Sequence, residues 1–183
     1  VERLRFALGG EARNADAYAN LASIYFEQGR LELARMVCEN AILLGIDDAV
    51  LHNRLGLVAL AQDDVIEAYG EFQRAVQLDP TYVEAHMNIG AMALSFRDYD
   101  QALAAFETVL ADRQDDLDAR LSYGAALRGV DEFDQARTEY EAILAVNPNH
   151  TGALYNMALL SQEATQNYPE ACQYYVRYLD SAG

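Results

Sequence analysis

The sequence predicts an all-α fold built from stacked antiparallel helix pairs. The first observation behind this prediction is a period of 34 residues that runs through the chain. Positions 34 residues apart form a column of large apolar side chains, Leu21, Leu55, Ile89, Tyr123 and Met157. The next position holds only small residues, Ala22, Gly56, Gly90, Gly124 and Ala158. A fixed period of this length is typical of a repeat protein whose units stack on their neighbours.

The second observation is helical spacing within each period. Apolar residues recur every three or four positions, which is the periodicity of a helix and not of a strand. Three further columns keep the same register: Ala34, Ala68, Ala102 and Ala136; then Cys38, Phe72, Phe106 and Tyr140; then Ala41, Ala75, Val109 and Ile143. Small residues let two helices approach closely, and the larger side chains fill the space beside them.

The third observation is a set of regularly placed breaks. Turn residues at 28–30, 63–64, 97–98 and 131–132 separate two helices within each unit. Pro80 and Pro148 end the second helix of two units, because proline lacks a backbone donor. The predicted units are 15–48, 49–82, 83–116, 117–150 and 151–183, the last with one extra residue near 165–167. Residues 1–14 are predicted to be the second helix of a truncated repeat, so the chain is expected to be a fragment.

These columns, the unit length and the closing prolines resemble the tetratricopeptide repeat family over essentially the whole chain. One departure is the absence of the signature tryptophan, whose column holds Tyr18, His52, His86, Arg120 and Leu154. The resemblance implies a right-handed α-solenoid that serves as a protein–protein interaction scaffold. It also implies that the first helix of each unit lines a concave groove.

Carried over by position, that groove is lined by Asn20, Asn53, Arg54, Leu57, Leu60, Met87, Asn88, Ala91, Leu94, Leu121, Ser122, Ala125, Arg128, Tyr155, Asn156, Leu159 and Gln162. A mostly apolar groove suits an extended peptide or an amphipathic helix of another protein. The column Asn20, Arg54, Asn88, Ser122 and Asn156 has two interpretations. Its amides either pair with a partner's backbone or bond to a neighbouring helix, and the second interpretation is favoured.

Charge limits the partner classes. There are 29 acidic residues and 13 basic ones, all arginine, for a net charge of -16. This excess disfavours nucleic acid and anionic membrane surfaces as partners, and no run is apolar enough to insert in a membrane. Asp16, Glu84 and Asp118 could steer a basic partner, but their place in the first turn of a helix is better explained by the helix dipole and by capping. A carboxylate clamp, known in chaperone-binding family members, is rejected because Arg54 would be its single cation and Glu84 opposes it.

No motif predicts catalysis, a cofactor or a metal. His52 and His86 are assigned to packing, Cys38 to the core, and the paired acids to solvated turns. Two alternatives to a plain binding scaffold stay open: a substrate-selecting array of a larger enzyme such as a glycosyltransferase, or a bacterial envelope assembly factor for a secretion, pilus or motility complex. The lysine-free composition suits a GC-rich bacterial genome, and the compartment, cytoplasmic or periplasmic, stays open. Five tyrosines between 155 and 178 indicate either array packing or self-association through the C-terminal helix.

Overall fold

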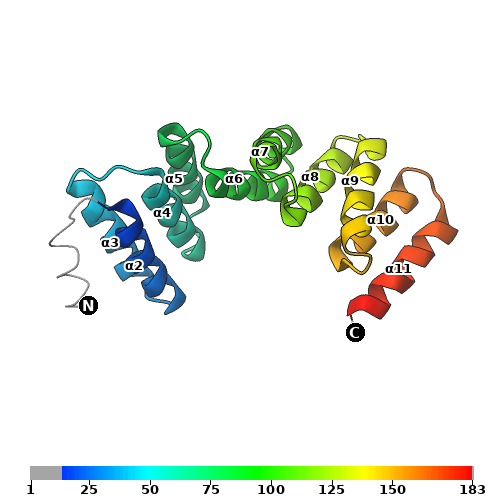
Figure 1. Cartoon of the computed structure of the whole chain (residues 1–183), viewed down its shortest axis with the longest axis horizontal. Coiled ribbons are helices and arrows are strands. Elements are labelled where there is room, and N and C mark those ends of the chain that lie inside the picture. The colour runs from blue at the N-terminus through cyan, green and yellow to red at the C-terminus, as the bar shows by residue number, and fades with distance from the viewer. Residues whose placement is uncertain (1–13, 183) are drawn as a thin grey trace. The chain divides into compact units, whose positions relative to one another are not determined.

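The computed structural model describes residues 14–182 (Figure 1). The helix predicted over residues 1–14 lies outside this part of the chain except for Asn14. The described residues form ten helices: α2 (Ala15–Glu27), α3 (Leu31–Leu43), α4 (Ala49–Ala61), α5 (Val65–Leu78), α6 (Val83–Ser95), α7 (Tyr99–Asp112), α8 (Leu117–Gly129), α9 (Phe133–Val146), α10 (Thr151–Glu163) and α11 (Tyr168–Ala182). The prediction of an all-α fold of antiparallel helix pairs is confirmed. The boundaries assigned to individual repeats remain predictions.

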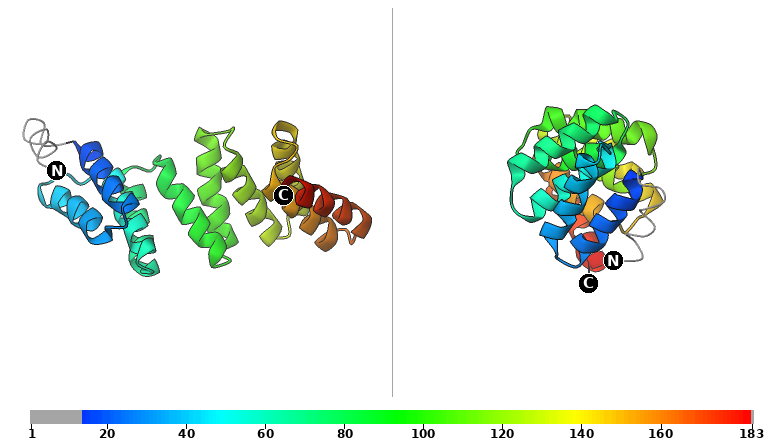
Figure 2. Two further views of the ribbon diagram at one scale, coloured as in Figure 1. Left: turned by 90° about the horizontal axis from the view of Figure 1, so that it is seen from below. Right: turned by 90° about the vertical axis from the view of Figure 1, so that its left-hand side faces the viewer.

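The chain divides into two compact units, Val1–Ala85 and His86–Gly183. In the first unit, α2 packs on α3, α4 packs on α5, and both α2 and α3 contact α4. In the second unit, α8 packs on α7 and α9, and α10 packs on α9 and α11. The antiparallel course of α10 and α11 can be followed at the orange and red end of the chain (Figure 2).

Aspartate side chains start several helices. Asp48 accepts a hydrogen bond from the backbone N–H of Val50 at 3.0 Å, and Asp64 accepts one from Glu67 at 3.0 Å. Asp98 and Asp116 occupy the same position before α7 and α8. Each cap satisfies an N–H group that has no partner within its own helix. Some of the acidic residues therefore act as N-caps that mark where helices begin.

The turn inside each helix pair contains one residue with left-handed backbone. These residues recur at the sequence period: Gly29 has φ 70°, Asp63 61°, Arg97 60° and Asp131 63°. In the last pair the turn is one residue longer and Gln166 takes this conformation, with φ 51°. Only glycine adopts it freely, so the turn geometry is imposed by the packing of the two helices it joins.

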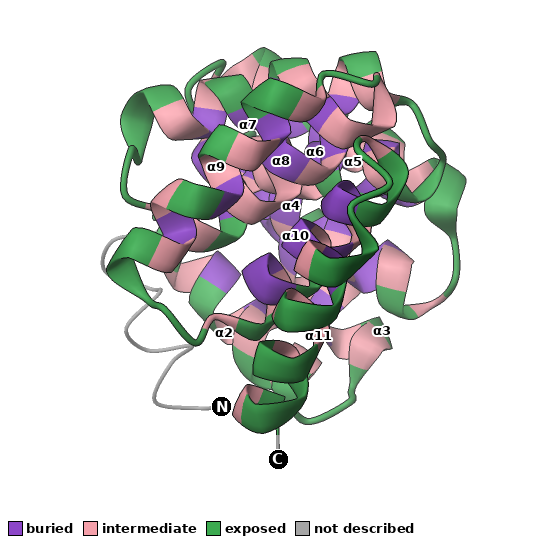
Figure 3. Cartoon of the chain, turned by 90° about the vertical axis from the view of Figure 1, so that its right-hand side faces the viewer, coloured by how far each residue is buried: buried purple, intermediate pink, exposed green. Residues whose placement is uncertain are grey.

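In three of the helix pairs, the core contains a glycine set against an aromatic ring. A Cβ atom placed on Gly56 would lie 2.5 Å from the ring of Phe72, and one on Gly90 would lie 2.7 Å from that of Phe106. Gly124 stands in the same relation to Tyr140, at 2.6 Å. Phe72, Phe106 and Tyr140 are fully buried, and the buried segments in Figure 3 are concentrated where helices face each other. These contacts fix which face each first helix leaves uncovered.

Among the described residues, no helix combines the length and the apolar character needed to span a bilayer.

Candidate partner-binding surface

In the first unit the predicted groove residues lie on α2 and α4. Asn20 is exposed, and Arg54, Leu57 and Leu60 are half-buried, so all four are open to a partner. Asn53 differs from the expectation, because it is only 2% exposed. Its side chain lies within reach of the Tyr82 hydroxyl, where it lowers the pKa of that group against the larger effect of burial. We therefore exclude Asn53 from the residues that a ligand could reach.

In the second unit the predicted residues lie on α6, α8 and α10. Ala91, Tyr155 and Gln162 are exposed, while Met87, Asn88, Leu94, Leu121, Ser122, Ala125, Arg128, Asn156 and Leu159 are half-buried. Met87 and Leu94 also pack against a cluster around Phe106, so one part of each side chain belongs to the core. The remaining part adds apolar area to the open face of the first helices.

The polar column does not behave as a uniform ladder. The Asn156 side chain donates to the backbone oxygen of Gly152 at 2.9 Å, within its own helix. Asn20 is exposed, and Ser122 is half-buried. The use of Asn156 within α10 shows that this position can serve its own helix, which differs from both interpretations made from the sequence.

Arg54 stands apart from the other half-buried arginines. Arg35, Arg120, Arg128 and Arg137 each form an ion pair with a glutamate. Arg54 has no ion pair among the described residues, and its buried Nε atom has no hydrogen-bond partner. A buried donor without an acceptor costs about 1–3 kcal/mol. The buried Nε atom of Arg128 also lacks a hydrogen-bond partner, but the guanidinium of Arg128 is paired with Glu163. Among these five described arginines, Arg54 is the one that lacks both, so it has most to gain from an incoming acceptor.

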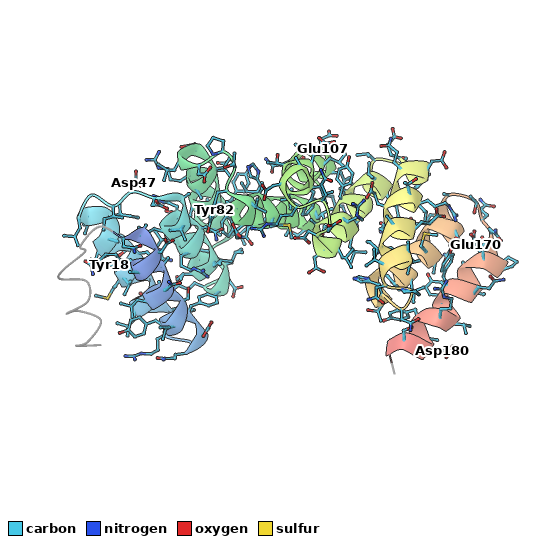
Figure 4. The ribbon with its side chains drawn as sticks, in the orientation of Figure 1. Tyr18, Asp47, Tyr82, Glu107, Glu170 and Asp180 are labelled. Carbon is cyan, nitrogen blue, oxygen red and sulfur yellow. The ribbon has the colours of Figure 1, made fainter. Side chains whose placement is uncertain are left out.

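Close to this face, the first unit has an acidic pocket of about 410 Å³. It is lined by Asp16, Asp47, Asp48, Ala49, Val50, Leu78, Asp79, Tyr82 and Glu84. Asp47 lies on the loop that leads into α4, and Tyr82 follows α5 (Figure 4). Burial, assisted by the nearby Glu84 charge, raises the pKa of Tyr82. The pocket therefore presents a negative field to any group that enters it.

Arg128 is held in place by a glutamate and by a buried tyrosine. Its Nη1 atom donates to Glu163 Oε2 at 2.7 Å. Burial disfavours its charge, but the hydrogen bond to Glu163, the charge of Glu163 and the nearby Tyr140 together outweigh burial and raise the pKa of Arg128. Tyr140 lies next to it with its side chain fully buried, and burial raises the pKa of Tyr140 to about 12. Arg128 thus differs from Arg54 in having an ion-pair partner, although its buried Nε atom also has no hydrogen-bond partner.

The sequence did not identify the charged neighbours of His52. The imidazole is 8% exposed, as expected for a packing residue. However, Nδ1 lies 2.6 Å from Glu71 Oε2, and Nε2 lies 2.7 Å from Asp47 Oδ1. The nearby Asp47 also accepts a hydrogen bond from Arg74 at 2.6 Å. Asp47 and Glu71 are on different elements from His52, so no local spacing identified them.

The C-terminal helix pair carries a tyrosine cluster at its open end. The Tyr155 ring centroid lies 6.1 Å from that of Tyr175 and 5.6 Å from that of Tyr178. On the outer side of α11, Tyr168, Val176 and Leu179 are 60%, 56% and 65% exposed. In Figure 3, α11 is largely exposed. This pair therefore combines an internal aromatic contact with an apolar stripe that faces solvent.

The two cysteines and the possible metal ligands show no arrangement typical of a reactive site among the described residues. Cys38 is fully buried and Cys172 is exposed, and both are free thiols. Within residues 14–182, no group of His, Cys, Asp or Glu side chains is arranged to hold a metal ion. The surface described above can bind through shape, apolar contact and hydrogen bonds.

Comparisons with known proteins agree with this description. The tetratricopeptide repeat family matches residues 15–44 and again residues 93–163. No curated protein matches the sequence. Among solved structures, YrrB, described as a tetratricopeptide repeat protein with an unusual peptide-binding site, is similar with a TM-score of 0.83 at 20% identity, over 97% of this chain and 91% of its own.

Two other structures show the same fold. MamA of Desulfovibrio magneticus RS-1 matches with a TM-score of 0.81 at 18% identity, over 92% of this chain and 94% of its own. PilF of Pseudomonas aeruginosa matches with a TM-score of 0.79 at 22% identity, over 95% of this chain and 79% of its own. A fold of this kind implies a scaffold for binding other proteins and is typically non-catalytic. The repeated columns, the helix pairs and these matches together show that the chain belongs to the tetratricopeptide repeat family.

Proposed function

We propose that the open face of the first helices binds a peptide or an amphipathic helix of a partner protein. The observation that carries the proposal is Arg54, a half-buried guanidinium on that face with an unsatisfied buried donor. Leu57 and Leu60, on the same helix α4, are half-buried and supply apolar area beside it. A partner that covers the leucines and brings an acceptor to Arg54 would satisfy both features.

The acceptor that fits best is a backbone carbonyl. A carboxylate would be attracted to Arg54 but repelled by the acidic pocket, which includes Asp16 and Glu84. A neutral carbonyl accepts the same hydrogen bond without that repulsion. Basic side chains elsewhere in the partner would be favoured by the same carboxylates. We therefore favour an extended or helical segment with basic residues near its Arg54 contact.

The likeness to YrrB supports the proposal only through the fold. YrrB is described as having a peptide-binding site, so chains of this architecture can bind peptides. At 20% identity the likeness carries no residue across. The choice of Arg54, Leu57 and Leu60 rests on this chain alone.

A peptide display library offers a direct test. We expect panning against the full chain to select binders that lose at least about tenfold in affinity for Leu57→Glu and for Arg54→Gln, since one lost contact of 1.4 kcal/mol is a factor of ten. Ile66→Glu is the matched control, because Ile66 is 89% exposed on α5 and outside the proposed face. Far-UV circular dichroism verifies that each variant is folded. Peptides that tolerate both groove changes, or a library that yields no binder, would count against the proposal.

We also propose a second interaction surface for self-association, on α11. Tyr168, Cys172, Val176 and Leu179 follow one another every three or four residues, and all are exposed. Apolar side chains in such a row are typical of a surface that another helix covers. Sedimentation across a concentration series, with reductant present to exclude a Cys172 cross-link, tests this proposal. A chain that stays monomeric at high concentration would contradict it.

A further inference from the structure

His52 connects three parts of the first unit. It lies on α4, and its two ring nitrogens reach Asp47 on the preceding loop and Glu71 on α5, at 2.7 and 2.6 Å. Asp47 is also held by Arg74 of α5, at 2.6 Å. His52 is only 8% exposed, so the ring is largely shielded from water, while the Asp47 and Glu71 side chains are 40% and 26% exposed. The loop at residues 44–48 is therefore attached to α5 through one histidine and one arginine.

This arrangement requires a protonated ring. A neutral imidazole has one donor nitrogen and one acceptor nitrogen, whereas both nitrogens of His52 face carboxylate oxygens. Burial disfavours the charged ring, but the hydrogen bonds to Glu71 and Asp47 outweigh it and raise the pKa of His52. Among neighbouring groups, Asp16 of α2 lines a pocket with Asp47. The Cys38 thiol of α3, also close to Glu71, stays neutral because burial raises its pKa to about 12.

In the second unit an arginine, whose charge does not depend on pH in the physiological range, makes the same connection. Arg120 and Glu139 stand two periods after His52 and Glu71, and Arg120 Nη1 lies 2.5 Å from Glu139 Oε2. The same arginine donates from Nη2 to the backbone oxygen of Gln114, on the loop before α8, at 2.8 Å. Arg120 thus ties the loop before a first helix to the following second helix, as His52 does. The difference is that arginine keeps its charge at every physiological pH, and histidine does not.

We propose that His52 is a pH-sensitive latch that holds the loop at residues 44–48 against α5. With the ring protonated, the latch is closed. When the proton leaves to water, one ring nitrogen still donates, but the lone pair on the other faces a carboxylate of Asp47 or Glu71. The connection through the ring is then broken on one side, while the Asp47–Arg74 ion pair remains. Asp47 lines the acidic pocket, so the latch acts on the position of one of its carboxylates, whereas the neighbouring Asp48 is held by its cap on α4. This inference does not depend on the proposed function.

The direction of the effect follows from the raised pKa. The latch stabilises the first unit fully below the ordinary histidine pKa of about 6.5, and this stabilisation is lost as pH rises through the folded pKa. Between those two values, one proton more is bound in the folded state. The ratio of folded to unfolded first unit therefore falls by up to about tenfold per pH unit in that window.

The experiment combines an NMR titration of the His52 ring with urea unfolding of the full chain at pH 6.5 and 8.5, followed through amide signals of α4 and α5. We expect the ring to titrate above its ordinary pKa. The wild type is expected to lose first-unit stability between the two pH values, and His52→Arg to remove that loss by copying Arg120. Arg120→His should introduce the same loss in α8 and α9. His86→Gln, one period after His52, is the control and should leave the wild-type dependence unchanged.

Two results would overturn the proposal. One is a His52 ring that titrates at or below its ordinary pKa. The other is a His52→Arg chain with the same pH dependence as wild type. If His52→Arg does not fold, the titration of the wild-type ring decides alone.

Discussion

Gly56 lies directly against the ring of Phe72, so that a Cβ atom on Gly56 would stand 2.5 Å from the ring. The same relation links Gly90 to Phe106 and Gly124 to Tyr140, one period apart. In the first pair, Ala22 faces the smaller Cys38 at these positions, and both belong to one buried cluster. In the three middle pairs, the small residue is therefore glycine where a fully buried ring lies against it. This relation determines how closely the two helices of each pair approach.

We predict that Gly56→Ala destabilises the first unit by about 1–3 kcal/mol, because the added methyl overpacks the core. This cost exceeds the gain of up to about 1 kcal/mol that alanine has over glycine in a helix. Urea unfolding followed by circular dichroism measures the change. Gly70→Ala is the matched control: an added Cβ there meets nothing within 4 Å, so a small stabilisation is expected. A Gly56→Ala chain as stable as wild type would contradict this account of the core.

Much of the fold could be predicted because its packing repeats. Within each of the large, small and aromatic columns, successive residues are 34 positions apart, so every helix pair shows the same pattern of residue sizes. The left-handed turn residues could not be predicted in this way. Gly29, Asp63, Arg97 and Asp131 share a backbone conformation but not a residue type. Glycine and aspartate adopt this conformation more readily than most residues, but Arg97 does not, so at Arg97 the helices on either side set it.

A second prediction concerns that turn. Arg97 has φ 60°, a region that costs a side-chain-bearing residue about 1–2 kcal/mol. Arg97→Gly should therefore stabilise the second unit by up to about 1 kcal/mol, after the loss of backbone entropy is subtracted. Gly29→Ala, at φ 70°, should destabilise the first unit for the same reason. Thermal unfolding of both variants tests the pair, and a change of the same sign in both would exclude this explanation.

The helix face of the candidate site could be predicted from the sequence, but the burial and the contacts of its individual side chains could not. The repeat register assigned Arg54, Leu57 and Leu60 to the first-helix face, where the structure leaves them partly open. It also assigned Asn53, which the structure buries beside Tyr82. Contacts between His52, Asp47 and Glu71 cross three elements, and only a comparison with Arg120 and Glu139 two periods later would have indicated them.

A third prediction concerns the two thiols. Burial raises the pKa of Cys38 to about 12, and the side chain is fully buried. Cys172 is exposed on α11. At pH 8 a thiol-specific reagent should modify Cys172 rapidly and Cys38 only after unfolding, because the thiolate is the reactive form. Mass mapping of the modified residue checks this, and fast labelling of Cys38 in the folded chain would show that the first unit opens.

A fourth prediction concerns acid stability. The hydrogen bond from Arg137 lowers the pKa of Glu170. The pair therefore stabilises the second unit above the ordinary glutamate pKa, and this contribution is lost as pH falls through the lowered value. Glu170→Gln should be less stable than wild type at pH 7, and the difference should shrink towards pH 3. Urea midpoints across this range measure the difference, and a constant gap would indicate that Arg137 and Glu170 are not coupled.

A fifth prediction concerns salt. If the carboxylates near the open face steer a basic partner, the association rate of a selected peptide should fall steeply as ionic strength rises, while its dissociation rate changes little. Stopped-flow mixing at several salt concentrations separates the two rates. An association rate independent of salt would assign these carboxylates to helix capping alone.

The central claim is that partners bind on the open face of the first helices, and an NMR map of a bound peptide tests it most directly. We predict that the largest amide shifts on adding a selected peptide fall on first-helix residues, led by Arg54, Leu57 and Leu60 of α4, or Ala91 and Leu159 of the second unit. Shifts confined to α3, α5, α7, α9 and α11 would place the binding surface on the second helices and contradict the claim.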